Sequence, residues 1–244
     1  MTVYKKILII KPSSLGDVVH SLAFLDAIKT CYPDASIHWV LARGLEDLLD
    51  GHPMIEKLWI IDKDTWKRPS QLLNTIREFR VLSRDLKAER FDLVVDLQGL
   101  FRSGFIASLT KARDIIGFKE SREGSRFFYT LKVEGGTNIH AVDRYLRISE
   151  HLGCTESYIQ FPLNTANNFV ELKNRFSLPD EYSIVVPGAR WDTKRWPAER
   201  FGKVVSELNV RSVIVGSGSD SKVAEIAKDN SGGNAISLAG KTTL

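Results

Sequence analysis

A short polar segment directly after an apolar run holds the first residues that could do chemistry. Residues 11–20 read KPSSLGDVVH and follow the run ILII. The segment supplies backbone amides at a helix start, the Ser14 hydroxyl and a close-approach glycine, Gly16, which together suit a phosphate or a sugar. Asp17 has two readings: it complements the dipole of the first helical turn, or it acts as a general base at the edge of a sheet.

A second loop combines cations with a helix start. Residues 187–201 read PGARWDTKRWPAERF, with Gly188 near the start and the pair Lys194 and Arg195 further on. A cation beside a helix N-terminus favours a diphosphate, because both attract negative charge. The alternative is a long loop whose two tryptophans pack into a domain interface.

Two further loops follow predicted strands and give weaker signals. The stretch DLQGLFRSG at 96–104 puts Gln98 in a strand-to-helix turn, where it either hydrogen-bonds a sugar hydroxyl or belongs to a capped turn. The stretch VGSGSDS at 215–221 resembles a glycine-rich nucleotide turn but lacks the third glycine. Asp220 in that stretch could still meet a nucleotide.

Positive charge is concentrated in the middle of the chain. The formal net charge is +4, and residues 56–147 hold 18 Lys and Arg against 13 Asp and Glu. Such an excess faces an anionic partner or is a solvated surface. No nucleic-acid motif accompanies it. The basic side chains of interest in this region are Lys67, Arg68, Arg122, Arg126, His140 and Arg144.

Composition indicates an ordinary globular protein. The 244 residues are 43% hydrophobic and 26% charged. No apolar run is long enough for a membrane-spanning helix, and the N-terminus lacks the apolar length of a signal peptide. Cys31 and Cys154 are far apart without metal-ligand spacing, which predicts two separate buried thiols in a reducing cytosol and no zinc site.

Strands and helices alternate along the chain, which predicts parallel sheets with helices on both faces. In the first half, strands are expected at 5–10, 36–41, 57–62, 91–98 and 114–118, and helices at 16–30, 71–90, 101–111 and 140–153. After an irregular polar stretch at 155–180, strands are expected at 182–186, 211–216 and 234–240, and helices at 197–208 and 220–229. Ligands of such sheets bind beyond the carboxyl ends of the strands, so the four loops above are where a site is expected.

Together these loops resemble glycosyltransferase family 9, in particular its type I lipopolysaccharide heptosyltransferases. The similarity is carried by KILIIKPSSLGDVVHSL at 6–22, DLVVDLQGLFRSG at 92–104, HAVDRYL at 140–146, the PGARWDTKRWP loop and LAGKTTL at 238–244. The resemblance implies an α/β fold of GT-B type, with two Rossmann-like domains and parallel sheets. The expected parts are an acceptor-binding domain at 1–154, a linker region at 155–180 and an incomplete donor-nucleotide-binding domain at 181–244.

The family transfers a heptose from ADP-L-glycero-D-manno-heptose to the Kdo sugar of the lipid A inner core. The transfer inverts the anomeric centre and uses neither a metal nor another cofactor. By resemblance, Asp17 is the base that deprotonates the acceptor hydroxyl, and Lys194 is the cation on the donor diphosphate, where a fixed charge stabilises the leaving group.

Residues from the loops complete the two predicted binding sites. The donor diphosphate and nucleotide are assigned to Lys194, Thr193, Gly188, Ser14, Gly16 and Asp220. The acceptor is assigned to Lys67, Arg68, Gln98, Arg122, His140 and Arg144. We expect a monomer that works in the cytoplasm at the inner-membrane surface and binds no nucleic acid.

One departure from the family concerns the end of the chain. Family members continue with a D-x-G-x-x-H-type segment that completes the nucleotide site, so the chain is expected to be cut before it. Two other functions stay open on the sequence. One is a non-catalytic sugar- or nucleotide-binding remnant, and the other is a different nucleotide-sugar glycosyltransferase or epimerase of the same fold.

Overall fold

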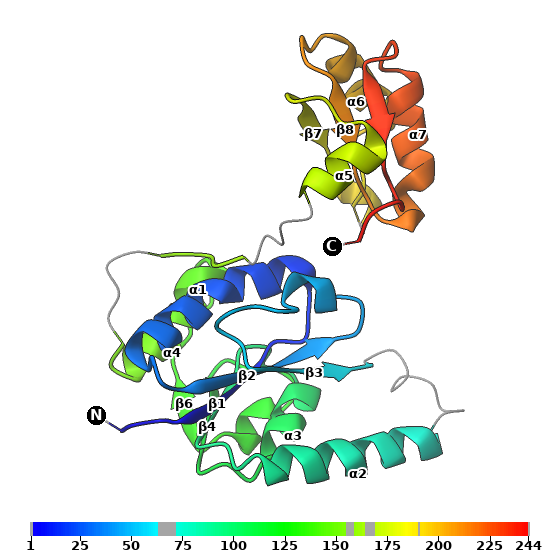
Figure 1. The fold of residues 1–244 in the computed structure, drawn as a ribbon. Coiled ribbons are helices and arrows are strands. Elements are labelled where there is room, and N and C mark those ends of the chain that lie inside the picture. Colours follow the sequence, from blue (N-terminus) through cyan, green and yellow to red (C-terminus); the bar gives the residue numbers. More distant parts are fainter. Residues whose placement is uncertain (1, 63–71, 155–158, 164–168, 190, 244) are drawn as a thin grey trace. The chain divides into compact units, whose positions relative to one another are not determined.

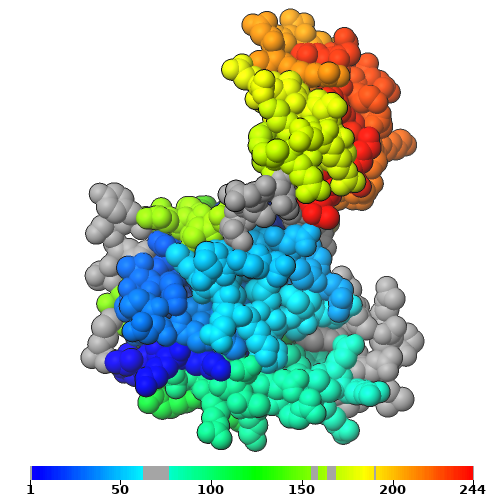
Figure 2. Space-filling model, viewed as in Figure 1, coloured from blue at the N-terminus to red at the C-terminus, as the bar shows by residue number. Residues whose placement is uncertain are grey.

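The chain divides into two compact units, Met1–Asn164 and Thr165–Leu244 (Figure 1). The computed structural model describes residues 2–62, 72–154, 159–163, 169–189 and 191–243. Figure 2 shows the surface of the two units, unit 1 in blue to green and unit 2 in yellow to red.

Unit 1 is built on a six-stranded sheet in the order β3-β2-β1-β4-β5-β6, and the paired strands run parallel. The strands are β1 (Lys6–Ile10), β2 (Ser36–Ala42), β3 (Lys57–Ile61), β4 (Leu93–Asp96), β5 (Asp114–Phe118) and β6 (Leu131–Val133). The helices are α1 (Leu15–Cys31), α2 (Leu72–Ala88), α3 (Phe101–Leu109) and α4 (Ala141–His151), with short 3-10 helices at Glu46–Leu48 and Ser125–Phe128.

The sheet of unit 1 is covered on both faces. Figure 1 shows α1 and α4 on one face and α2 and α3 on the other. Ile7 and Ile9 of β1 belong to the first core cluster, while Leu8 and Ile10 belong to the second. A strand buried on both sides has to be apolar at successive positions, which explains the continuous run in the sequence.

The two cysteines are joined, which corrects the expectation of separate thiols. Cys31 ends α1 and Cys154 follows α4, and the two form a disulfide with their Cα atoms 5.5 Å apart. They are 123 positions apart in the sequence. Their pairing depends on how α1 packs beside α4, which cysteine spacing alone does not reveal.

Unit 2 holds a three-stranded parallel sheet in the order β7-β8-β9. The strands are β7 (Ser183–Val185), β8 (Ser212–Ile214) and β9 (Ala235–Ser237). The helices are α5 (Phe169–Phe176), α6 (Ala198–Ser206) and α7 (Ser221–Asp229), with 3-10 helices at Asp192–Lys194 and Gly218–Asp220. A Cβ added at Gly202 of α6 would lie 2.5 Å from the Ala227 carbonyl oxygen, so glycine is what lets α6 and α7 touch.

Two elements differ from the sequence-based prediction. Helix α5 lies inside the stretch 155–180 that was expected to be irregular, and β6 was not predicted. Helix α5 has only eight residues and none of them is buried, so no core position marked it within a polar stretch of the sequence. Strand β6 has only three residues, and its place is fixed by pairing with β5 and not by a pattern of its own.

Candidate functional site

The carboxyl ends of three neighbouring strands in unit 1 lie level with one another. Ile10 at the end of β1 is paired with Asp96 at the end of β4, which is paired with Gly117 of β5. The residues that follow these strands line a pocket of about 320 Å³ together with residues of α1 and α4. Its charged and amide side chains are Lys11, Asp17, Gln98, Glu120, Arg122 and Arg144.

Asp17 lies in the first turn of α1 and lines this pocket. Its Oδ2 atom accepts hydrogen bonds from the backbone N–H of Ser14 at 3.0 Å and from the Ser14 hydroxyl at 2.7 Å. Burial raises the pKa of this carboxyl, but the two bonds from Ser14 and the nearby Lys11 and His20 bring the pKa below its ordinary value of 3.8. Asp17 therefore caps the helix and also presents a charged carboxylate.

Lys11 is a pocket residue that sequence reasoning missed. It is the first residue after β1, its side chain is only 4% exposed, and its Nζ lies 5.4 Å from the centre of the Tyr145 ring. Burial lowers the pKa of Lys11, and the carboxylates of Asp17 and Asp96 oppose that shift. The available signal was a lysine placed directly after a continuous apolar strand, at the edge where ligands bind.

Arg144 and Gln98 line the pocket, and each also has a buried polar atom without a hydrogen-bond partner among the described residues. These atoms are Arg144 Nε and Gln98 Oε1. The Arg144 guanidinium lies 4.4 Å from the centre of the Phe118 ring, which holds its plane in place. A guanidinium only donates and an amide both donates and accepts, so two such side chains at a pocket suit a ligand with hydroxyl groups, such as a sugar.

Asp96 builds the turn between β4 and α3. Its Oδ1 accepts from the backbone N–H groups of Gln98 at 2.9 Å and Gly99 at 3.0 Å, and its Oδ2 accepts from Ser103 Oγ at 2.8 Å and Tyr129 Oη at 2.7 Å. Burial raises the pKa of Asp96 although all four bonds oppose it. Asp96 thus caps the turn between β4 and α3. The Gln98 side chain is not needed for this cap and remains available to a ligand.

The other predicted acceptor residues differ in position. Arg122 is exposed at the pocket, where its backbone N–H donates to Gly99 O at 3.0 Å. His140 is the N-cap of α4, and its Nδ1 accepts from Val142 N at 3.3 Å. Its ring lies 5.1 Å from that of His20. Lys67 and Arg68 lie outside the described residues.

In unit 2, two of the predicted donor residues are in contact. A Cβ added at Gly188 would lie 2.4 Å from Asp220 Oδ1, so the loop after β7 touches the turn after β8. Asp220 Oδ2 accepts from Ser217 N at 2.9 Å and from Ser217 Oγ at 2.6 Å. The carboxyl ends of β7 and β8 therefore meet at one edge, as expected of parallel strands.

The cationic loop of unit 2 is held by Arg195. Its Nε donates to Ala189 O at 2.6 Å, and its Nη1 contacts Asp192 Oδ1 at 2.7 Å. Thr193 and Lys194 lie in the 3-10 helix of this loop with exposed side chains. Of the two adjacent cations, Arg195 shapes the loop and Lys194 stays at the surface. Ser14 and Gly16, also predicted to contact the donor, lie in unit 1 beside Asp17.

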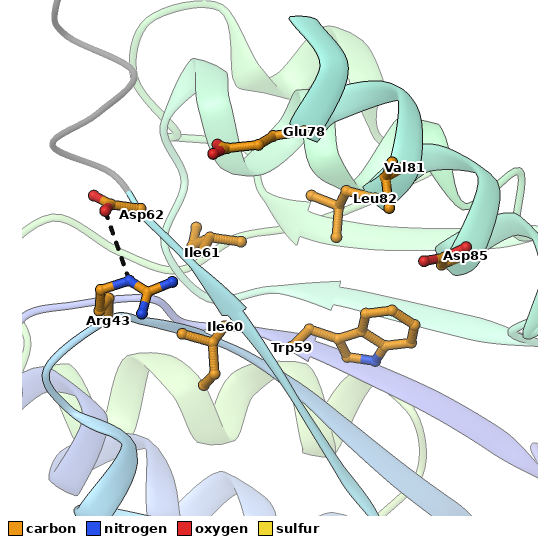
Figure 3. A pocket seen from close by; sticks show the side chains of 9 residues that line it. All are labelled: Arg43, Trp59, Ile60, Ile61, Asp62, Glu78, Val81, Leu82 and Asp85. Atoms are coloured by element: carbon orange, nitrogen blue, oxygen red, sulfur yellow. Dashed lines mark ion pairs between the residues drawn. The ribbon is translucent and has the colours of Figure 1, made fainter. Parts of the chain in front are cut away.

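A second pocket of about 290 Å³ lies in unit 1 between β3 and α2. Figure 3 shows Ile60, Ile61 and Leu82 at its apolar wall, and Arg43 paired with Asp62 at 3.6 Å. Among the residues that the structure describes, none of those predicted for a site lines this pocket. Within the described residues, no three metal-ligating side chains form a group, and no helix is both long and apolar enough to cross a bilayer.

The fold and the pocket define a class of protein: parallel α/β units with a charged pocket at the carboxyl edge of the larger sheet. The sequence profile of glycosyltransferase family 9 (heptosyltransferase) matches residues 79–244. The chain therefore belongs to this glycosyltransferase family.

Curated relatives agree with that assignment. Lipopolysaccharide heptosyltransferase 1 of Escherichia coli K12 is 26% identical over 207 residues, which are 83% of this chain and 64% of the relative. Lipopolysaccharide core heptosyltransferase OpsX of Haemophilus influenzae is 24% identical over 86% of this chain and 59% of the relative. The chain thus spans about six-tenths of the length of these relatives.

Solved structures confirm the predicted fold class, an α/β fold of GT-B type. The family 9 glycosyltransferase from Veillonella parvula has a TM-score of 0.86 at 25% identity, covering 100% of this chain and 71% of that one. The E. coli heptosyltransferase WaaC with ADP-2-deoxy-2-fluoro heptose has a TM-score of 0.77 at 22% identity, covering 96% of this chain and 76% of that one.

Proposed function

We propose that this chain binds the acceptor and contributes the base in an inverting, metal-independent transfer of heptose. In the proposed reaction, heptose passes from ADP-L-glycero-D-manno-heptose to the Kdo sugar of the lipid A inner core. Family membership supports the proposal, as do a relative named lipopolysaccharide heptosyltransferase 1 and a solved neighbour that contains a fluorinated ADP-heptose.

The observation that carries the proposal is the position of Asp17. Its carboxylate lies in a sugar-sized pocket that also holds Lys11, Arg122 and Arg144. A general base has to be ionised before it can accept a proton, and the hydrogen bonds from Ser14 keep the pKa of Asp17 low.

The proposed step conserves atoms and charge. The Asp17 carboxylate accepts the proton of the acceptor hydroxyl while that oxygen attacks the anomeric carbon of the heptose. The bond between that carbon and the diphosphate oxygen breaks on the opposite side, and ADP leaves with the electron pair. Attack opposite the leaving group inverts the anomeric centre.

The acceptor side is proposed to recognise an acidic sugar. Lys11, Arg122 and Arg144 supply positive charge to the pocket, and the guanidinium and amide groups of Arg144 and Gln98, which also line it, suit carboxylate and hydroxyl groups. Lys67, Arg68 and His140 stay in the proposed acceptor set through the resemblance of the surrounding sequence.

The donor side is proposed to use the second unit. Lys194 is assigned to the diphosphate and Thr193, Gly188 and Asp220 to the nucleotide or diphosphate, with Ser14 and Gly16 contributing from the start of α1. The exposed ammonium of Lys194 and the contact between Gly188 and Asp220 support this assignment. In this proposal residues 1–154 are the acceptor domain, 155–180 the linker and 181–244 the donor part.

We further propose a monomer that acts at the cytoplasmic face of the inner membrane. The reason is chemical: the proposed acceptor is a membrane lipid, so the enzyme has to reach its sugar headgroup at the bilayer surface. No nucleic-acid partner is part of the proposal.

The test is transfer from ADP-heptose to a Kdo-bearing lipid A, followed by mass spectrometry of the lipid. Asp17→Asn keeps a hydrogen-bond acceptor for Ser14 but removes the base, so it should abolish transfer. Asp26→Asn, on the same helix α1 and outside the pocket, is the matched control and should keep transfer.

Acceptor binding is measured separately by calorimetry with a deacylated Kdo acceptor. Binding without transfer by the unmodified chain would favour the non-catalytic binding protein over the enzyme. Conversion of ADP-heptose without any acceptor would favour an epimerase, and full activity of Asp17→Asn would remove the proposed base.

A further inference from the structure

An aromatic patch is exposed on unit 1, made by Phe101, Phe105, Phe127 and Phe128. The exposed fractions of Phe101, Phe105 and Phe127 are 50%, 36% and 79%. Three of the rings form one connected group: the Phe101 and Phe105 centroids lie 6.4 Å apart, and Phe128 lies 5.4 Å from Phe101 and 6.3 Å from Phe105. Phe127 is the chain neighbour of Phe128. Large apolar side chains gathered at a surface mark an interaction site more strongly than scattered ones.

A glycine of α3 allows the aromatic patch to form. A Cβ added at Gly104 of α3 would lie 2.7 Å from the Phe128 ring, so only glycine lets Phe128 pack this closely on α3. With Phe128 held against the helix, its neighbour Phe127 is left pointing outward. Phe79 of α2 packs on Phe105 at 5.7 Å and supports the patch from the side.

Arginines border the aromatic patch. The Arg126 guanidinium lies 5.4 Å from the centre of the Phe127 ring, and Arg102 lies on α3 three positions before Phe105, hence beside Phe105 on the helix surface. Glu123 is the acidic neighbour, and its Oε2 accepts from Phe101 N at 3.2 Å. Exposed aromatic rings beside arginines are the composition of a surface that lies in a bilayer interface with anionic headgroups.

The patch and the charged pocket share their loops. Gly99 lines the pocket and Phe101 begins the patch two residues later. Arg122 lines the pocket, and the 3-10 helix Ser125–Phe128 follows three residues on. Two residues of extended chain span at most about 7 Å, so the edge of the patch adjoins the mouth of the pocket.

We propose that the aromatic patch docks unit 1 on an anionic lipid bilayer, with Phe101 and Phe127 entering the interface and Arg102 and Arg126 contacting lipid phosphates. This placement would present the pocket to a sugar at the end of a membrane lipid. The inference rests on the proposed function only for that last point, because docking on lipid needs neither donor nor acceptor.

The experiment is co-sedimentation of the full chain with phosphatidylcholine vesicles, with and without phosphatidylglycerol. Phe127→Ser should weaken binding to the mixed vesicles about tenfold, since even partial burial of a Phe side chain is worth about that factor. Phe101→Ser combined with Phe127→Ser should weaken it further. Arg126→Gln should cost about fivefold, and only on vesicles that contain phosphatidylglycerol.

Phe161→Ser is the matched control, because Phe161 is 42% exposed in unit 1 and lies outside the patch. Circular dichroism checks that every variant is folded. The proposal would be overturned if the double Phe variant bound vesicles as well as the unmodified chain. It would also be overturned if the unmodified chain self-associated without lipid and the double change abolished that association. Transfer to a water-soluble deacylated acceptor should be equal in Phe127→Ser and the unmodified chain, so loss of docking and failure of the proposed transfer are told apart.

Discussion

Two turns of this chain have the same local structure and different surroundings. In the first, Asp17 Oδ2 accepts from Ser14 N at 3.0 Å and from Ser14 Oγ at 2.7 Å. In the second, Asp220 Oδ2 accepts from Ser217 N at 2.9 Å and from Ser217 Oγ at 2.6 Å. Each joins the carboxyl end of a parallel strand to a helix, so the Ser-x-x-Asp spacing satisfies free backbone donors in both places.

The surroundings separate the two turns. Asp17 opens onto a pocket with Lys11, Arg122 and Arg144. Asp220 is packed against Gly188, and no cation of the described part of unit 2 forms an ion pair with it. A capping aspartate becomes a candidate base through the charges around it, because the cap itself is common to both turns.

The largest expected effect comes from removing the charge of each aspartate in turn. Asp17→Asn should lower kcat for heptosyl transfer by about 100-fold to 10,000-fold, the range typical of a lost general base. Asp220→Asn should lower kcat less than about tenfold and act mainly on the KM for the donor. Steady-state kinetics with both substrates check this, and equal losses of kcat would contradict the distinction between the turns.

The second-largest effect is expected at Lys11, the buried cation beside the first turn. Lys11→Met should raise the KM for the acceptor about 10-fold to 100-fold, since it removes a hydrogen bond to a charged group. Lys5 is an exposed lysine just before β1, at the opposite end of the strand from Lys11, and Lys5→Met should leave that KM unchanged.

The stability of Lys11→Met has a definite sign. Burial holds the pKa of Lys11 in the folded chain below its value in the unfolded chain, so the charged lysine opposes folding at neutral pH. Thermal unfolding of Lys11→Met at pH 7 should therefore occur at the same temperature or a higher one. A large loss of stability together with an unchanged KM would show that Lys11 serves packing alone.

A smaller effect distinguishes the glycines of the two turns. Gly188→Ala should destabilise unit 2 by about 1–3 kcal/mol, because the new Cβ would collide with Asp220. Gly16→Ala should change stability by no more than about 1 kcal/mol, and in the stabilising direction, because Ala favours the helix and no atom lies within 4 Å of its Cβ. Urea unfolding of both variants measures the difference. An equal loss of unfolding free energy in both variants would mean that the two turns are equally packed.

The smallest effect is on pH dependence. The two bonds from Ser14 help to keep the pKa of Asp17 low, and Ser14→Ala removes one of them. The acid limb of kcat/KM should move to higher pH, because Asp17 then takes up its proton earlier as the pH falls. Stabilisation from the ionised carboxylate, present above the unfolded pKa, should shrink in this variant and vanish at low pH. Ser217→Ala is the matched change in the second turn and should leave the acid limb in place.

The fold was largely predictable because its signals are local. Apolar runs and amphipathic helices predicted the alternating elements, and the structure has them with ends that differ by up to three residues. Helix α5 and strand β6 were missed because α5 buries no residue and β6 is only three residues long. The disulfide between Cys31 and Cys154 was missed because it depends on the packing of α1 beside α4.

The site was predictable in part. Asp17, Gln98, Arg122 and Arg144 were selected from the sequence, and the structure brings them into one pocket. The position of Lys11 directly after an apolar strand was a signal that was not used, and its burial beside these residues appears only in the structure. In the loop of unit 2, the residue pattern offered two adjacent cations and the family resemblance selected Lys194. The structure adds that Arg195 is held within the loop by its bonds to Ala189 O and Asp192.

The sequence by itself determined most of the elements, their alternation and both Ser-x-x-Asp caps, because these depend on residues close together in the chain. The tertiary structure alone decided which cap faces a charged pocket, which lysine is buried there and which phenylalanines remain at the surface. Those outcomes depend on residues that are distant in the chain and are brought together by strand register and helix packing. Electrostatic and burial effects act through space, so the chain order does not reveal them.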